Sequence, residues 1–404
     1  MPARARQPPP PCLPERFGPT SAPRTRLAEL YLSTNGGNID SADYAGIYVV
    51  TDRIEVARKR VDIASLNPDE LTGSDLTGGY ILKIDSVDPD EIGWTTKRRF
   101  PENDGSSVVL VSPAAADIAP AQLTYIKDYV QRMEDALVES RDSAWTRRTY
   151  LDFIDRGSWV DQHLLQVFSA NPDALVRSTY LTKDRNGRLV SGPAWDFDRA
   201  LGSYWDERSF RHDVWFGVGA TDVWQTGWWG ILCRDPEFMQ DWIDRWQSLR
   251  QSVLSDASLL ALADSQSAAI GPAALARDAA KWPQTTPEYV PGLTGGLTAM
   301  KTWFTTRTAW IDEQFVAAPS LTAGATTITV RAATGAQLAY TLDGSDPRSL
   351  GGRLAPNALL TSAPLTVPST SNLHARSYRA DREGVFPGSP WSSATGGSKS
   401  SPLA

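Results

Sequence analysis

Two aspartates near the middle of the chain, Asp173 and Asp196, could do chemistry if the fold brings them together. Between them lies Asn186-Gly187, a strong short-range signal for a β-hairpin, with β-prone residues on both sides. A hairpin returns the chain to its starting point, so residues 23 positions apart become neighbours in space. Two carboxylates ~4 Å apart repel by about 4 kcal/mol at an effective dielectric of about 20. A shared proton, a basic partner or a divalent cation must therefore offset the repulsion.

Asp198 adds a third carboxylate, and a cluster of oxygen ligands favours Mg²⁺, Mn²⁺ or Ca²⁺ over zinc. The alternative is a structural ion pair with Arg177 or Arg199 at a solvated end of the hairpin. Protein kinases use two aspartates around such a strand pair. One orients or deprotonates the acceptor hydroxyl, and the other, followed by Phe, holds Mg²⁺ against the nucleotide phosphates. Asp173 and Asp196-Phe197 fit these two positions.

The elements that position these aspartates follow from the spacing of apolar residues. Alternation and turn residues predict strands over 27–33, 44–51, 78–84 and 107–112, the first two pairing as an antiparallel hairpin. Helical spacing and capping signals predict helices that begin near Pro120, Ser158 and Pro236, and one over 297–315. Short strands with polar turns after Pro319 predict a β-sandwich. The order of elements indicates an α+β domain followed by an all-β domain.

These patterns divide the chain into five predicted segments. The first is proline-rich and aperiodic, and we interpret it as disordered or foreign to the fold. The segments are the N-terminal residues 1–26, a β-rich region 27–112, a mostly helical region 113–318 with the catalytic hairpin, a β-sandwich 319–395 and a flexible tail 396–404.

Composition excludes several classes of protein. The 404 residues carry a net charge of −7, and an acidic surface repels phosphate backbones, so we expect no nucleic-acid partner. Two cysteines and three dispersed histidines exclude a disulfide scaffold and a histidine-based zinc hydrolase. No apolar run reaches the ~18 residues of a membrane span. The basic N-terminus lacks the apolar core of a signal peptide. The scarcity of cysteine agrees with a cytosolic protein or a bacterial secreted one.

The segment from Asn171 to Gly202 has the pattern N-x-D…S-T-Y-L-x-K-D-x-x-G-x-L…G-P-x-W-D-F-D-x-x-x-G and resembles the CotH (spore coat protein H) kinase family. Further blocks extend the resemblance to about residues 24–315: upstream 44–54, 60–62 and 78–85, and downstream 227–250. The resemblance implies an atypical protein-kinase-like fold with a partial N-lobe and a mostly helical C-lobe. It also implies transfer of the γ-phosphate of ATP, with Mg²⁺ or Mn²⁺, to Ser or Thr of a protein substrate.

The same resemblance assigns roles to residues. Asp173 becomes the catalytic aspartate and Asp196 the metal ligand, with Asp173 and Asp198 as neighbouring metal-binding carboxylates. The strand that ends at Val50 leads into the hinge beside adenine. The predicted nucleotide-binding residues are Thr51, Asp52, Arg53, Lys83 and Trp195.

One departure from the family pattern concerns the phosphates. Members of the family carry an R-G-N-S-like phosphate loop and paired lysines ahead of the strand that begins here near Leu27, and residues 1–26 contain neither. Loss of one preorganised donor costs about 10²–10³ in rate, so we expect impaired activity, with Lys83 a substitute cation. Two alternatives stay open: a non-catalytic pseudokinase for surface assembly, and a carbohydrate-active hydrolase using Asp173 and Asp196 as an acid/base pair.

The C-terminal region carries Y-T-L-D-G-S-D-P-R over 340–348 and A-R-S-Y over 375–378. These motifs resemble the chitobiase/β-hexosaminidase C-terminal domain, which implies an accessory Ig-like β-sandwich without a reaction of its own. Such modules occur in secreted proteins, so the resemblance predicts secretion or cell-surface location and association with a surface or polysaccharide through the sandwich.

Overall fold

A computed structural model of the chain describes residues 22–34, 36–98, 106–202, 209–215, 223–283 and 296–396. Most of the predicted N-terminal segment 1–26 and nearly all of the predicted tail 396–404 lie outside the described residues. The described chain is a mixture of helices and several sheets, in agreement with the predicted α+β class.

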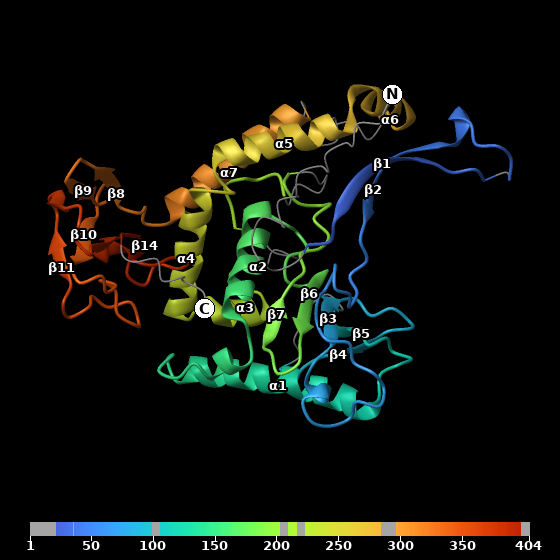
Figure 1. Cartoon of the computed structure of the whole chain (residues 1–404), viewed down its shortest axis with the longest axis horizontal. Coiled ribbons are helices and arrows are strands. Elements are labelled where there is room, and N and C mark those ends of the chain that lie inside the picture. The colour runs from blue at the N-terminus through green and yellow to red at the C-terminus, as the bar shows by residue number, and fades with distance from the viewer. Residues whose placement is uncertain are drawn as a thin grey trace.

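The N-terminal strands form a separate antiparallel hairpin. Strand β1 (Thr25–Tyr31) pairs with β2 (Tyr44–Thr51), and their register runs from Thr25 opposite Thr51 to Tyr31 opposite Tyr44. The predicted hairpin is therefore confirmed, with β1 beginning two residues earlier than expected. In Figure 1 the hairpin projects at the upper right, away from the larger sheet.

The larger sheet has the strand order β4-β5-β3-β6-β7, and every neighbouring pair is antiparallel. Its strands are β3 (Tyr80–Asp85), β4 (Ile92–Trp94), β5 (Ser107–Ser112), β6 (Thr179–Lys183) and β7 (Leu189–Ser191). The sheet thus combines strands from both sides of residue 112, where the sequence suggests a boundary. Helix α1 (Pro120–Asp142) lies along one face, where its apolar side chains join the core with those of Tyr80, Leu82 and Leu110.

Six further helices follow in the described part of the chain. They are α2 (Arg156–Ser169), α3 (Gly227–Leu232), α4 (Pro236–Arg250), α5 (Asp256–Ile270), α6 (Pro272–Lys281) and α7 (Leu297–Gln314). Short 3-10 turns lie at Ser41–Asp43, Asp75–Thr77, Thr149–Asp152 and Ala380–Arg382. Large indole rings fill the space between α2, α3 and α4, where Trp159, Trp229 and Trp246 are fully buried. The centroids of Trp159 and Trp229 stack 4.5 Å apart, so aromatic packing dominates this core.

Helix α2 shows how tertiary context adjusts a predicted boundary. The sequence predicts a start at Ser158, but Asp155 is the N-cap and accepts a hydrogen bond from the Ser158 amide at 2.8 Å. The helix therefore begins at Arg156, since an Asp at the cap position satisfies an otherwise unpaired donor. Among the described helices, none is by itself both long and apolar enough to cross a membrane, although α5 and α6 together, bent by 75°, reach that length and composition.

The C-terminal region consists of two antiparallel sheets that enclose a small core. One has the order β11-β10-β13-β14 and the other β12-β9-β8. The strands are β8 (Ser320–Ala323), β9 (Thr327–Arg331), β10 (Gln337–Thr341), β11 (Leu359–Thr361), β12 (Leu365–Pro368), β13 (His374–Tyr378) and β14 (Trp391–Gly396). Val330 and Val367 from the second sheet pack against Leu338 and Ala375 from the first. The predicted short strands and their sandwich-like arrangement are present.

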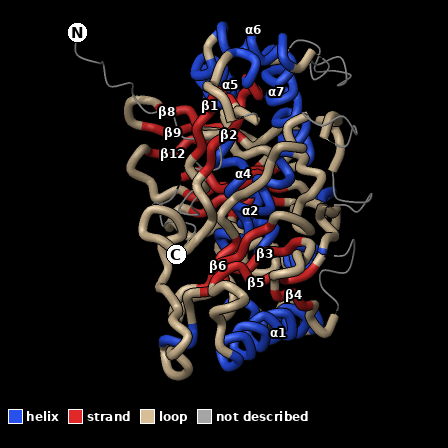
Figure 2. Tube along the Cα trace, turned by 90° about the vertical axis from the view of Figure 1, so that its right-hand side faces the viewer, coloured by secondary structure: helices blue, strands red, loops and turns tan. Residues whose placement is uncertain are grey.

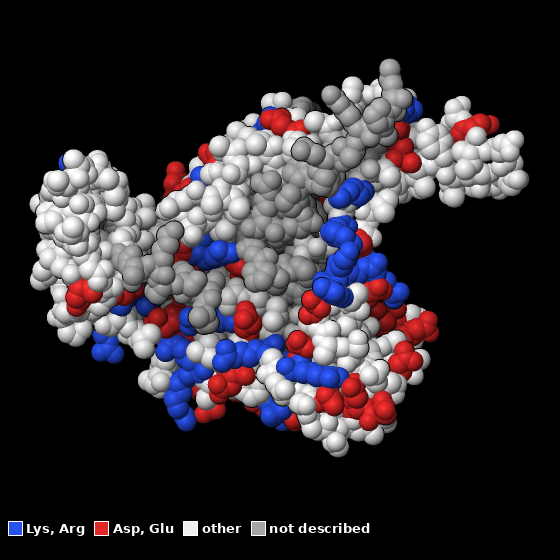
Figure 3. All heavy atoms as spheres, viewed as in Figure 1, with Lys and Arg blue, Asp and Glu red and all other residues white. Residues whose placement is uncertain are grey.

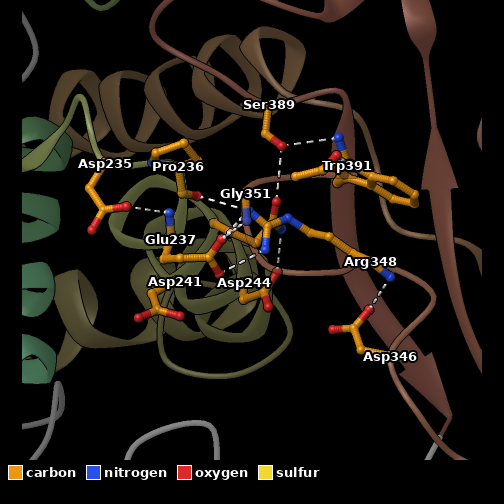
Figure 4. A network of polar contacts seen from close by, with 12 residues as sticks. Asp235, Pro236, Glu237, Asp241, Asp244, Asp346, Arg348, Gly351, Ser389 and Trp391 are labelled. Atoms are coloured by element: carbon orange, nitrogen blue, oxygen red, sulfur yellow. Dashed lines mark hydrogen bonds and ion pairs between the residues drawn. The ribbon is translucent and has the colours of Figure 1, made fainter. Parts of the chain in front are cut away.

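Ion pairs attach these C-terminal sheets to helix α4. Arg348 donates to both carboxylate oxygens of Glu237, at 2.8 and 3.0 Å, and the two side chains point toward one another in Figure 4. Arg376 similarly bonds Asp244 at 2.8 and 3.0 Å, and it also bonds Asp346 of its own region at 2.6 Å. Because both arginines are more than nine-tenths buried, these bonds set the position of the sheets on α4.

Asp235 is the N-cap of α4, and its side chain is fully buried. Its carboxylate accepts bonds from Arg148, from the Tyr150 hydroxyl at 2.7 Å and from the Glu237 amide at 3.0 Å. We expect Asp235→Ala to lower the free energy of unfolding by about 3 kcal/mol, because it leaves the Arg148 guanidinium largely buried without a partner. Urea denaturation measures this. Asp381→Ala, which removes an exposed pair with Arg379, is the control and should leave the midpoint nearly unchanged.

Candidate functional site

The predicted hairpin between the two aspartates is present. Strands β6 and β7 pair antiparallel with Lys183 opposite Leu189, and the Gly187 amide donates to the Asp184 carbonyl at 3.1 Å to close the turn. Asn186 adopts a left-handed φ of 53°, a conformation that Asn tolerates better than most residues. The Asn-Gly signal therefore identified the turn correctly.

Asn171 ties the two ends of this hairpin together. Its side-chain oxygen accepts a bond from the Asp173 amide at 3.1 Å, and its Nδ2 donates to the Asp196 carbonyl at 3.4 Å. Asn171 is only 3% exposed and follows Ala170, whose left-handed conformation ends α2. One buried amide thus holds the backbones of Asp173 and Asp196 next to each other.

The Asp173 carboxylate is engaged by a basic side chain. Arg199 Nη1 donates to both carboxylate oxygens, at 2.8 and 3.0 Å. The ion pair expected as the alternative is therefore confirmed for Asp173 with Arg199, whereas Arg177 bonds the Ser86 hydroxyl. Because the Asp173 side chain is 16% exposed, the pair is partly shielded and ionised Asp173 has a local counter-charge.

The Asp196 carboxyl lies in a more demanding environment. Burial raises its pKa, a bond from the Ser178 hydroxyl at 3.0 Å opposes that shift, and neighbouring Asp198 raises the pKa further. Asp196 also has a φ of 61°, in the left-handed region. Of eight described non-glycine residues with positive φ, six lie between 170 and 201. Backbone strain of this kind concentrates at functional sites, so this segment is the strongest candidate.

Asp173, Asp196 and Asp198 do not form a three-carboxylate cluster, but carboxylate oxygens remain suitable ligands for a hard divalent cation. Among the described residues, no group of three or more His, Cys, Asp or Glu side chains is arranged to hold a metal ion. Asp196 and Asp198 are close enough for Asp198 to raise the pKa of Asp196, while Asp173 pairs with Arg199. Two adjacent carboxylates, one with a raised pKa, are oxygen donors that Mg²⁺ or Mn²⁺ accepts. The metal-binding role of the three aspartates stays a prediction.

A cavity of about 390 Å³ opens beside Asp196. Its lining residues come from the start of the described chain, from β1 and β2, and from the segment after β7: Ala22, Pro23, Thr25, Val49, Thr51, Ala194, Trp195, Asp196, Phe197 and Asp198. The volume is within the range of small-ligand sites, and the lining is mostly apolar but includes two carboxylates. Thr51 and Trp195, both predicted to contact nucleotide, are therefore brought together with Asp196 and Asp198.

The other predicted nucleotide-binding residues do not line this cavity. Asp52 bonds Arg24 at 2.6 Å, which lowers its pKa, and Arg53 is exposed. Lys83 pairs with Glu91 at 2.8 Å and lies opposite Tyr180 in the sheet. Lys83 is thus an ion-paired residue of the central sheet, not a solvated lysine at its surface.

Three residues near the aspartates were absent from the predicted site. Asn171 and Ser178 hold Asp196 directly, and Tyr180 contacts the Trp195 ring edge-on with centroids 6.3 Å apart. Burial, and then the nearby carboxylates including Asp196, raise the pKa of Tyr180 to about 12. Asn two residues before Asp173 is a recognisable side-chain turn signal, whereas Ser178 and Tyr180 belong to the S-T-Y-L block of the family motif, which by itself indicates no contact with Asp196 or Trp195.

Helix α6 holds the hairpin that forms one wall of the cavity. Asp278 accepts a bond from the Ile47 amide at 2.8 Å, and Trp282 Nε1 donates to the Ala45 carbonyl at 3.0 Å. Gly46 lies between Ala45 and Ile47 and has a φ of 126°. Any larger residue is disfavoured there, since its Cβ would lie 2.8 Å from Trp282 Nε1. At the other strand, Arg277 makes two 2.7 Å bonds to Glu29.

Part of the hairpin is exposed with respect to the described residues. Tyr48, Val49 and Val50 are 47–61% exposed, and the outer surface of the hairpin is largely uncharged in Figure 3 apart from a few acidic side chains. Figure 2 shows β1 and β2 running from the central sheet toward α5 and α6. Within the part of the chain that the structure describes, the bonds from α6 thus attach this wall to the helical region.

We expect Asp278→Ala to loosen the hairpin. Loss of the bond to the Ile47 amide should speed hydrogen exchange of the β1 and β2 amides by about tenfold, as measured by exchange mass spectrometry. Ala279→Ser, on the exposed side of the same helix, is the matched control. Equal exchange in both variants would contradict the attachment role of α6.

We also expect Asp196→Asn to be more stable than the wild type at pH 7. The folded-state pKa of Asp196 is raised, so its stabilising contribution is present only at low pH and is lost as the pH rises through that pKa. Asn removes the cost of the ionised form and can still accept the bond from Ser178. The gain in Tm should shrink as the pH falls toward 4, and the same scan on Asp90→Asn, an exposed substitution away from the site, is the control.

Comparison with known proteins identifies the family of the chain. A search of curated proteins found no match. The family profile described as CotH kinase protein matches residues 16–311, which include the hairpin, Asn171, both aspartates and every described residue that lines the cavity. Since the matched region covers most of the 404 residues, the chain belongs to the CotH kinase protein family.

Proposed function

We propose that this chain is an atypical protein kinase that transfers the γ-phosphate of ATP to a Ser or Thr hydroxyl of a protein. One observation carries the proposal: Asp196 and Asp198 line the same cavity as Thr51 and Trp195, and Asn171 ties the backbone of Asp196 to that of Asp173. The apolar part of the cavity is suitable for adenine, with Thr51 at one wall, and the carboxylate end for the phosphates with their metal.

Each aspartate has a distinct part in this mechanism. Asp196 and Asp198 would hold Mg²⁺ or Mn²⁺, which supplies positive charge against the phosphate oxygens. Asp173 orients the acceptor hydroxyl and accepts its proton, which requires Arg199 to release at least one carboxylate oxygen. Arg199 can then turn toward the transferring phosphate, since a guanidinium binds phosphate as well as carboxylate.

Phosphate binding is expected to be weak in this chain. None of the described residues that line the cavity is Lys or Arg, and Lys83 is already paired with Glu91. We therefore propose impaired catalysis, and a pseudokinase that assembles proteins at a surface is the main alternative. The ion pair between Asp173 and Arg199 is consistent with either state.

The C-terminal sheets suggest where the protein acts. We propose that they form an Ig-like, chitobiase-type accessory module on the kinase-like body, and that the protein acts outside the cell or at its surface. The module would associate with polysaccharide while the aspartates act on a protein substrate. Its buried ion pairs with α4 make it a fixed part of the body.

Nucleotide binding and transfer test the proposal separately. The wild type should gain thermal stability with ATP and Mn²⁺, and Asp196→Asn should lose this gain because the metal ligand is removed. Asp173→Asn should keep the gain but lose transfer from radiolabelled ATP to casein or to itself by about 10²–10⁴-fold. The exposed variant Asp88→Asn is the control for both measurements.

Different outcomes separate the alternatives. An ATP-dependent gain without transfer in any variant, Arg199→Ala included, would favour the pseudokinase. If ATP does not stabilise the wild type, the kinase proposal fails. Release of reducing sugar from chitin or glucan, lost in Asp173→Asn, would instead favour the hydrolase, for which the raised pKa of Asp196 would provide the acid.

A further inference from the structure

A second, larger cavity lies where helix α4 meets the C-terminal sheets. Its volume is about 600 Å³, and its lining comes from three segments, 233–239, 348–354 and 378–390. It shares no lining residue with the cavity beside Asp196. The ion pair between Arg348 and Glu237 crosses this junction, so the cavity has walls that are fixed before any ligand enters (Figure 4).

Two arginines at this cavity are available to an anion. Arg234 and Arg353 are exposed, and neither forms an ion pair with another described residue. The Arg234 guanidinium carbon lies 3.9 Å from the centroid of the Phe386 ring. Stacking occupies the flat face of the guanidinium and leaves its N–H edge open, which is the geometry that binds a carboxylate through two parallel bonds.

An acceptor lies on the same lining. Glu383 is exposed and accepts one bond, from the Tyr378 hydroxyl to Oε1 at 2.7 Å, which leaves Oε2 for a ligand hydroxyl. A carboxylate here repels a simple inorganic anion but favours a molecule that also carries hydroxyl donors. Met239, Leu354 and Val385 add apolar surface for the C–H face of such a molecule.

We propose that this cavity binds an acidic sugar, a saccharide unit that carries a carboxylate. Arg234 and Arg353 bind the carboxylate, Glu383 accepts a hydroxyl, and the apolar wall contacts the ring. The inference rests on the proposed association with polysaccharide, and it identifies this cavity as the place where the saccharide binds. It is independent of phosphoryl transfer, because no residue of the hairpin takes part.

Calorimetric titration with trigalacturonate tests the proposal on the full chain. The probes for comparison are its methyl ester, which keeps the hydroxyls without the charge, and succinate, which keeps the charge without the sugar. We expect binding of the acid only, weakened about tenfold or more by Arg234→Gln and by Arg353→Gln. Arg331→Gln, an exposed arginine of β9 outside the cavity, is the matched control and should bind normally.

Each other outcome overturns the proposal. Equal binding of the ester or of succinate would show that the site does not select an acidic sugar. Binding of trigalacturonate that Arg234→Gln and Arg353→Gln leave unchanged would place polysaccharide association elsewhere on the protein. If the wild type does not bind trigalacturonate, the cavity is not a site for acidic sugars. The ATP-dependent thermal shift, measured on the same preparation, would still report separately on the kinase function.

Discussion

The buried amide of Asn171 is the contact on which the candidate site depends. It bonds the Asp173 amide on one side and the Asp196 carbonyl on the other, so both ends of the β6–β7 hairpin are held by one side chain. A hairpin alone leaves its ends free to separate. Because Asn171 is 3% exposed and its bonds are shielded from water, separation would leave polar groups unpaired in the core.

The electrostatics of the site follow from this constraint. Desolvation raises the pKa of Asp196, and neighbouring Asp198 raises it further, so its ionised form is less favourable than that of a free aspartate. Asp173 instead pairs with Arg199. The two ends of one hairpin therefore carry a carboxylate that is paired with Arg199 and a carboxylate with a raised pKa, together with left-handed backbone at Ser178 and Asp196. Unfavourable ionisation and backbone strain of this kind are typical of functional sites.

Two peripheral attachments shape the cavities on either side of this centre. Helix α6 holds the β1–β2 hairpin and so fixes the wall opposite Trp195. Helix α4 holds the C-terminal sheets through Arg348 and Arg376 and so forms the second cavity. In both cases directed polar bonds join the segments whose residues line a cavity. Changes at these attachments should therefore alter binding without unfolding the tryptophan-rich core.

The sequence by itself determined the local elements and the hairpin. Asn186-Gly187 specified the turn, alternation located β2 and β5 at their observed bounds, and Asp235-Pro236 marked the start of α4, because each signal acts over a few residues. The motif around the aspartates also identified the family. Only the tertiary structure decided that Arg199 pairs with Asp173 and that Lys83 pairs with Glu91, because side-chain partners depend on which strands become neighbours. The same reason explains why the sequence did not predict the bond from Ser178 to Asp196, the support from α6 or the cavity at the α4 junction. They are contacts between segments tens to hundreds of residues apart, where no local preference applies.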